Sequence, residues 1–408
     1  MHNEGVRSCF VQGPTEVQTM SDPATAQPTL LFIPDISGFT RFVHETEIQH
    51  SQHIIEELLE AIIDANEIGL SVSEIEGDAV LFYRPGPAPT AAALLAQVQR
   101  MYVAFHGHLR RYDSHRICHC GACSTASGLS LKFIAHHGEV GTNIIKDHPM
   151  LFGRDVIAAH RLMKNPVESP EYVLLTHDLI NACATWVEIE QAAWAQPVEG
   201  EASYDLGTVR YCSIPLEPLR AHVPEPRVED YSLPGATRKV KSHDAIIEAP
   251  IELVFNVLSD LSVRHHWMVG LKGSDRLSSK LPQHGATHRC VMKDSEKDPF
   301  IYSHSFDVSE DYVTFTDTEP RMGWSNVFTL RRLGPSSTRM ESHMFIKDLL
   351  VMRILFRLFM MRKMEENDAK SAHRLNDYCK TLLREGRNHT SRVRLRPSST
   401  TTSVPPVA

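Results

Sequence analysis

Two aspartates in the first quarter of the chain stand where a divalent cation could be held. Asp35 closes an apolar run over residues 30–34, and a Ser-Gly turn and a helical pattern follow it. A carboxylate at the end of a buried strand, ahead of a helix, is a usual position for a metal or phosphate site. With Asp78 on a neighbouring strand end and the carbonyl of Ile36, it would suit Mg²⁺ or Mn²⁺ on a nucleotide's phosphates, which Gly38 would let approach the backbone. The competing interpretation is that Asp35 caps a helix and Asp78 lies in a hairpin turn.

A cysteine-rich loop offers a second set of metal ligands. Its sequence, Ser-His-Arg-Ile-Cys-His-Cys-Gly-Ala-Cys, places His115 close to Cys118, Cys120 and Cys123. Three thiolates and an imidazole can form a tetrahedral Zn²⁺ site, whose role would be to fix the entry to a strand at 129–137. The alternatives are free thiols or a redox pair.

Composition narrows the class of protein. At 408 residues the chain is too long for one ordinary core, so we expect two domains. The net charge of −8, without a basic block before the C-terminal tail, argues against a nucleic-acid binder. Eight cysteines are too few for a disulfide scaffold, which favours a reducing compartment. Because no apolar run reaches transmembrane length, we expect a cytoplasmic protein without a transmembrane segment.

Two patterned blocks are separated by a Pro-rich linker. We expect disordered ends at 1–28 and 387–408, a first domain at 29–220, a linker at 221–238 and a second domain at 239–386. Hydrophobic periodicity in the first block predicts the order β-α-β-β-α-β, an α+β sandwich. Its predicted elements are a strand at 30–35, a helix at 48–68, strands at 70–76 and 78–84, a helix at 90–112, and a strand at 129–137.

The second block has a different pattern. A strand at 240–248 and a short helix at 251–260 precede a series of strands up to residue 347, and a long helix at 348–384 closes the domain. We expect this helix to cross the concave face of a curved antiparallel sheet, an arrangement that often leaves an apolar cavity. The apolar stretch 349–361 fits a core helix, and membrane-surface contact is its alternative.

Four segments of the first block resemble the motifs of class III nucleotidyl (adenylate/guanylate) cyclase domains. They occur in the cyclase order, at 32–40, 74–82, 133–141 and 153–161. The Asp-Val-Ile-x-Ala-His-Arg-Leu form that begins at Asp155, together with the cysteine-rich loop, resembles an uncharacterised cyclase-like family. The resemblance implies a ferredoxin-like α/β sandwich that binds a purine nucleoside triphosphate with metal. It also implies a homodimer, because cyclase sites form between two such domains.

The resemblance assigns roles to individual positions. Asp35 and Asp78 match the two metal ligands, and Glu74 matches the base-selecting residue, where guanylate cyclases also carry Glu. Met150 stands at the partner base contact, although its thioether makes no strong polar bond. Arg161 matches the arginine that stabilises the transition state.

Two departures concern catalysis. Ile157 stands where cyclases carry an Asn, and the Lys-Gly-rich segment that holds the triphosphate has no counterpart in 203–215 except Arg210. Losing one transition-state donor costs about 10²–10³ in rate. The metal half of the site therefore matches the family, while the transition-state half does not.

The second block resembles START-like or polyketide-cyclase-like (SRPBCC) helix-grip domains. The resemblance rests on residues 245–260 and the following His265-His266-Trp267, and it implies a hydrophobic small molecule or lipid as ligand. Two functions follow. One is a signalling protein that binds a purine nucleotide with metal, with or without weak cyclase activity, coupled to a ligand pocket. The alternative is a non-enzymatic ligand-binding protein whose degenerate cyclase fold serves dimerisation.

Overall fold

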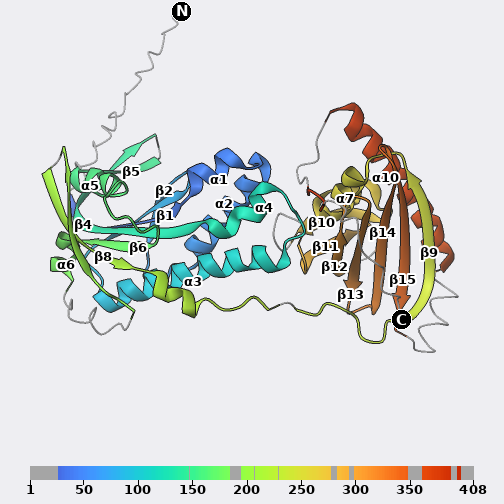
Figure 1. Ribbon diagram of the computed structural model, residues 1–408, viewed down its shortest axis with the longest axis horizontal. Helices are drawn as coiled ribbons and strands as arrows, with labels where there is room; N and C mark the ends of the chain where they lie inside the picture. The colour runs from blue at the N-terminus through green and yellow to red at the C-terminus, as the bar shows by residue number, and fades with distance from the viewer. Residues whose placement is uncertain are drawn as a thin grey trace, which may run out of the picture.

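The computed structural model contains two sheets of an α+β chain, placed side by side along the long axis (Figure 1). The structure describes residues 26–146, 148–183, 194–205, 207–227, 229–276, 283–293, 298–347, 361–386 and 393–396. The expected disordered ends therefore lie almost wholly outside the described residues, and so does most of the apolar stretch 349–361.

The first sheet has eight strands in the order β2-β3-β1-β4-β6-β8-β7, with β5 paired to β4. Its first four strands in the sequence have the order β4-β1-β3-β2 of a ferredoxin-like sheet, and β6 runs parallel to β4. The strands are β1 Gln27–Ser37, β2 Ser71–Glu76, β3 Ala79–Pro85, β4 Ser130–Ile145, β5 His148–Phe152, β6 Tyr172–Thr176, β7 Val198–Tyr204 and β8 Gly207–Pro215.

Helices cover both faces of this sheet, which explains why the middle of β1, residues 30–34, is an unbroken apolar run. Leu30 and Phe32 belong to the core beneath α2 and α3, while Leu31 and Ile33 pack toward α5 on the other face. Thr90 caps α3 by accepting a hydrogen bond of 3.2 Å from the amide of Ala93. The helices are α1 Phe39–Glu45, α2 Ile48–Asp64, α3 Ala91–His115, α4 Gly121–Thr125, α5 Arg154–Leu162 and α6 His177–Ala182.

The second sheet is antiparallel throughout, in the order β10-β11-β12-β13-β14-β15-β9. Its first strand thus pairs with its last, which brings the start and the end of this half together. The strands are β9 Arg238–Ile247, β10 Leu271–Arg276, β11 Ala286–Met292, β12 Phe300–Val308, β13 Tyr312–Glu319, β14 Trp324–Gly334 and β15 Ser337–Ile346, with helices α7 Ile251–Ser259, α8 Arg264–Trp267 and α10 Met361–Arg384.

The terminal helix α10 lies against this sheet beside β9 (Figure 1). Lys241 of β9 forms an ion pair with Asp368 of α10. Two to three helical turns further along α10, Lys380 binds Glu248 at 2.6 Å, and the amide of Glu248 donates to Asn376 at 2.8 Å. These contacts hold α10 against the edge strand β9. In the part of the chain that the structure describes, no helix is both long and apolar enough to cross a membrane.

Candidate functional sites

The two aspartates of the first block do lie next to each other. Asp35 lies two residues before the end of β1 and pairs in register with Ala79, and Asp78 is in the turn between β2 and β3. The amide of Ile36 donates to the carbonyl of Asp78 at 3.0 Å, which fixes the two strand ends together. Gly38 has φ +90°, a left-handed conformation that favours glycine, at the start of the short helix α1.

A lysine that the sequence analysis did not identify completes this group. The Nζ of Lys132, on β4, lies 3.1 Å from Asp35 Oδ2 and 3.3 Å from the carbonyl oxygen of Met163. Burial raises the pKa of Asp35, which is only 6% exposed, and the charge of Lys132 opposes this. Burial and the neighbouring charge of Asp35 raise the pKa of Asp78 to about 6. The ammonium group of Lys132 therefore already balances part of the negative charge of this pair.

The two predicted base contacts lie at one exposed edge of the sheet. Glu74 is on β2, where its Oε1 is 3.8 Å from Nε2 of His160, and Glu76 approaches the other ring nitrogen at 3.7 Å. These three side chains could also share a cation. Met150 is on β5, close to β2, and is 55% exposed. A thioether so exposed provides surface rather than a polar contact to a base.

The residues at the two predicted transition-state positions, Arg161 and Ile157, are exposed to solvent. Arg161 is exposed, and its Nη2 lies 3.3 Å from Oδ2 of Asp205, in the β7–β8 turn. Ile157, at the position of the cyclase Asn, is 49% exposed on the same helix, α5. Arg210 pairs in register with Glu201 on β7–β8. One copy of the chain therefore does not gather these groups around Asp35 and Asp78.

The three cysteines of the loop do converge, and the fourth group of the cluster is His50 of α2. The Nδ1 of His50 is 3.1 Å from Sγ of Cys120 and 3.5 Å from the sulfurs of Cys118 and Cys123. All four ligand atoms lie within 4.8 Å of one another, and all four residues are buried. His115 lies elsewhere: its ring stacks on that of His284 with the centroids 5.8 Å apart. The structure therefore places His50 in the position that the sequence analysis gave to His115.

The thiols influence one another's protonation. Hydrogen bonds with Cys120 and Cys123 lower the pKa of Cys118 to about 4. Hydrogen bonds with Cys118 and Cys120 raise the pKa of Cys123. The cluster thus favours at least one thiolate, the form that binds metals. The sequence analysis did not identify His50 because it lies on α2, 70 residues before Cys120. Its signal in the sequence is a polar side chain in the first turn of α2.

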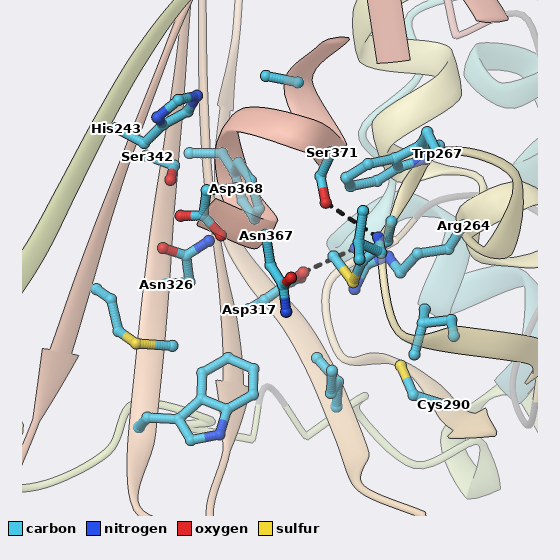
Figure 2. Close-up of a pocket in the computed structure, with 18 of the residues that line it drawn as sticks. His243, Arg264, Trp267, Cys290, Asp317, Asn326, Ser342, Asn367, Asp368 and Ser371 are labelled. Atoms are coloured by element: carbon cyan, nitrogen blue, oxygen red, sulfur yellow. Dashed lines mark hydrogen bonds and ion pairs between the residues drawn. The ribbon is translucent and has the colours of Figure 1, made fainter. Parts of the chain in front are cut away.

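A cavity of about 280 Å³ lies between α10 and the second sheet (Figure 2). Asn326 and Ser342 reach it from the sheet, and Asn367 and Asp368 reach it from α10. Most of the remaining wall is apolar and rich in methionine, with Met268, Leu271, Met292, Ile301, Met322, Trp324, Phe328, Met340 and Met344.

One side of the cavity is built on a buried ion pair. Arg264 Nη2 donates to Asp317 Oδ2 at 2.7 Å, and the other oxygen of Asp317 accepts from Ser303 at 2.6 Å. Trp267 stands beside Arg264 and is 3% exposed (Figure 2). Within the described part of the chain, neither the indole N–H of Trp267 nor Nε of Arg264 has a hydrogen-bond partner. The rings of His265 and His266, the other residues of that motif, are in contact in a tilted arrangement, with their centroids 4.0 Å apart.

Comparisons with known proteins give the following similarities. Residues 55–172 match a family described as a protein of unknown function (DUF2652). An uncharacterized protein of Mycobacterium tuberculosis is 35% identical over 127 residues, which is 31% of this chain and 58% of that protein. The match thus spans less than two thirds of this relative's length.

Solved structures similar to this chain include nucleotidyl cyclase domains, which cover about half of it. One is the catalytic core of a rhodopsin-guanylyl cyclase in complex with ATPαS, at 15% identity over 47% of this chain and 98% of that one, with TM-score 0.34. Another is the guanylate cyclase domain from Catenaria anguillulae in complex with GTP, at 15% identity over 46% of this chain and 96% of that one, with TM-score 0.33. A third is the adenylyl cyclase CyaB from P. aeruginosa, at 16% identity over 47% of this chain and 95% of that one, with TM-score 0.30. Similarity at this level does not establish what the chain does.

Proposed function

We propose that this chain binds a small, mostly apolar molecule in the cavity between α10 and the second sheet, as a START-like helix-grip domain would. The observation that carries the proposal is the cavity itself, with its methionine-rich wall and two buried donors without partners. Its volume of about 280 Å³ lies near the lower end of the range for small-molecule sites, about 300–1,000 Å³. Methionine side chains adapt to irregular apolar ligands.

The polar groups define the other end of the ligand. A buried N–H without an acceptor costs free energy, and a ligand oxygen near Trp267 would remove that cost. Arg264 is already neutralised by Asp317, so the site offers hydrogen-bond donors without a free positive charge. The ligand class is therefore an apolar body that carries a neutral acceptor such as a ketone, ester or hydroxyl oxygen.

Calorimetric titration with 2-nonanone and nonane tests this function. We expect the ketone to bind at least fivefold more tightly, since one hydrogen bond contributes about 1 kcal/mol. In Trp267→Phe the two affinities should become equal, while in Ala372→Phe, which fills the cavity, both should be lost. Circular dichroism checks the fold of both variants. If neither compound binds the unmodified protein, the proposed function is wrong. If the ketone and nonane bind it equally tightly, only the proposed hydrogen bond to a ligand acceptor oxygen is refuted.

A second candidate function concerns the first half of the chain. Burial and, after it, the neighbouring charge of Asp35 raise the pKa of Asp78, and a divalent cation would relieve the repulsion between the two carboxylates. We propose Mg²⁺ or Mn²⁺ at this pair with a purine nucleoside triphosphate, whose base Glu74 would contact. Ile157 and the Arg161–Asp205 pair leave the transition state without its donors, so turnover would be weak or absent.

Incubation with Mn²⁺ and either GTP or ATP separates binding from turnover. A cyclic product seen by chromatography and lost in Asp35→Ala would support a cyclase. A nucleotide-dependent thermal shift without product would support binding alone. Absence of both would exclude the nucleotide function, and it would leave the pocket function intact.

For the cysteine loop we propose a structural Zn²⁺ ion with Cys118, Cys120 and Cys123 as thiolate ligands. Three thiols whose sulfur atoms lie within 4.8 Å of one another are a donor set that structural zinc sites use. Metal analysis of the purified protein should find about one zinc per chain, and less in Cys120→Ser and Cys123→Ser. Equal zinc in all three proteins would end this proposal.

A further inference from the structure

We infer that His50 is the fourth ligand of this zinc site, and that the completed site fastens the C-terminal segment 393–396 to the first half of the chain. The inference rests on the Zn²⁺ proposed for the cysteine loop, and it adds a ligand, a geometry and a partner segment. The ion would thereby join three parts of the chain that are far apart in sequence: α2, the cysteine loop and the C-terminal segment.

The interatomic distances carry the first step. A tetrahedral zinc with Zn–S of about 2.3 Å and Zn–N of about 2.05 Å separates its nitrogen and sulfur ligands by about 3.6 Å. The three Nδ1–Sγ distances of His50 are 3.1, 3.5 and 3.5 Å. One ring nitrogen therefore faces all three sulfurs at nearly the spacing that a shared ion imposes.

Burial supports the same conclusion. His50 and Cys120 are each 1% exposed, and Cys118 and Cys123 are 3% and 2% exposed. Buried imidazole and thiol groups are costly unless their polar atoms are satisfied, and a metal ion satisfies all four together. His115 is excluded because its ring stacks on His284, and its carbonyl accepts the amide of His284 at 3.2 Å.

The C-terminal segment binds directly to a ligand of the site. The amide of Arg394 donates to Sγ of Cys118 at 3.2 Å, and the amide of His119 donates to the carbonyl of Arg394 at 3.0 Å. The side chain of Arg394 reaches Glu47, at the start of α2, at 3.5 Å. An N–H bond to a metal-held thiolate is charge-assisted and so stronger than one to a neutral thiol.

The same segment is bonded to the second half of the chain on its other side. The amide of Val393 donates to Oδ1 of Asn256, on α7, at 2.9 Å, and the carbonyl of Arg396 accepts the amide of Glu310 at 2.9 Å. Val393 and Leu395 are 3% and 4% exposed, so they pack into the core between the halves. The segment thus links the zinc loop to α7 and to the β12–β13 turn.

The ligand set is tested by metal affinity and by the spectrum of the Co²⁺-substituted protein. His50→Ala should weaken zinc binding at least tenfold, whereas His115→Ala, the matched control, should bind as the unmodified protein does. His50→Cys should restore binding with four thiolates and shift the visible Co²⁺ bands, which guards against a mere folding defect. Unchanged affinity in His50→Ala, or loss only in His115→Ala, would overturn the assignment.

The fastening is tested separately by hydrogen exchange of the peptide that contains residues 393–396, with zinc and after chelation. We expect its amides to lose at least tenfold protection on zinc removal, while a peptide from β14 and β15 stays protected. Equal protection in both states, in a protein shown to bind zinc through His50, would refute the fastening and leave the zinc site standing. A protein that binds no zinc would refute the proposed ion itself.

Discussion

Lys132 Nζ lies 3.1 Å from Asp35 Oδ2, so a side-chain ammonium occupies one side of the carboxylate pair that was expected to hold a metal. Asp35 and Lys132 are directly opposite each other in the register of β1 and β4. The Lys132 ammonium, fixed opposite Asp35 by the pairing of β1 and β4, can neutralise part of the negative charge that a divalent ion would neutralise. Asp35 and Asp78 therefore depend less on a metal ion for their stability than two carboxylates without a lysine would.

Replacing this lysine should make the site depend on an ion. In Lys132→Met we expect the free energy of unfolding to fall by about 3 kcal/mol in metal-free buffer, because a buried carboxylate loses its partner. Mn²⁺ should then raise the melting temperature more in the variant than in the unmodified protein. Lys164→Met, at an exposed lysine near the site, should change neither quantity. A variant that Mn²⁺ does not stabilise would show that the aspartates hold no cation.

The protonation of Asp78 should appear in the pH dependence of stability. Its folded pKa of about 6 lies above its ordinary value of 3.8, so the folded state holds this proton more tightly. The stabilisation it contributes is therefore complete below about pH 4 and is lost as the pH rises through 6. Chemical denaturation between pH 4 and 7 should show this decline, and Asp78→Asn should flatten it. Because metal and proton compete, Mn²⁺ affinity should rise over the same interval.

Local patterns predicted most of the first sheet. The apolar run ending at Asp35 and the Gly77 turn before β3 are local signals, and they were enough to place both aspartates at adjoining strand ends. Lys132 could not be found in this way, because its contact depends on strand register. His50 could not be found for a similar reason, because its contact with the cysteines depends on the fold. His115 was preferred because it is only three residues from Cys118 in the sequence.

The elements that were missed lack strong patterns. The strand β5 is only five residues long and contains a proline, and β10 reads Leu-Lys-Gly-Ser-Asp-Arg, with a glycine and three charges. Both are strands because β4 and β11 supply hydrogen-bonding partners. Tertiary pairing therefore overrides weak local preference here. The cavity was expected from the element order, but its polar residues come from separate elements and could not be listed in advance.

The buried ion pair of the cavity should be far more important for stability than an exposed one. Arg264→Met leaves Asp317 without its cation in a site that is 1–3% exposed, and we expect a loss of about 3–5 kcal/mol in the free energy of unfolding. Arg289→Met breaks the exposed pair with Asp275 on β10 and β11 and should cost about 0–1 kcal/mol. Urea denaturation of both variants gives the comparison. Similar losses in the two would mean that water reaches Arg264 and Asp317.

The exposed apolar side chains of β5 should form the contact between two copies, if the nucleotide function proposed for the first half holds. Met150 and Phe152 are 55% and 73% exposed and point to one side of the strand, since they are two residues apart. Ile157 of α5, at 49%, adds to the apolar surface of the same end of the sheet. Such exposed groups mark interaction surfaces, and a second copy would also supply the polar groups that one copy does not gather around Asp35.

Phe152→Glu should therefore weaken the dimer at least tenfold in sedimentation equilibrium, because it puts a charge into an apolar contact. Leu333→Glu, at a residue 54% exposed on β14, is the matched control and should leave the association unchanged. The unmodified chain should be a dimer at micromolar concentration. A monomer throughout that range, or equal effects of the two substitutions, would place the association surface elsewhere and remove the support for a shared nucleotide site.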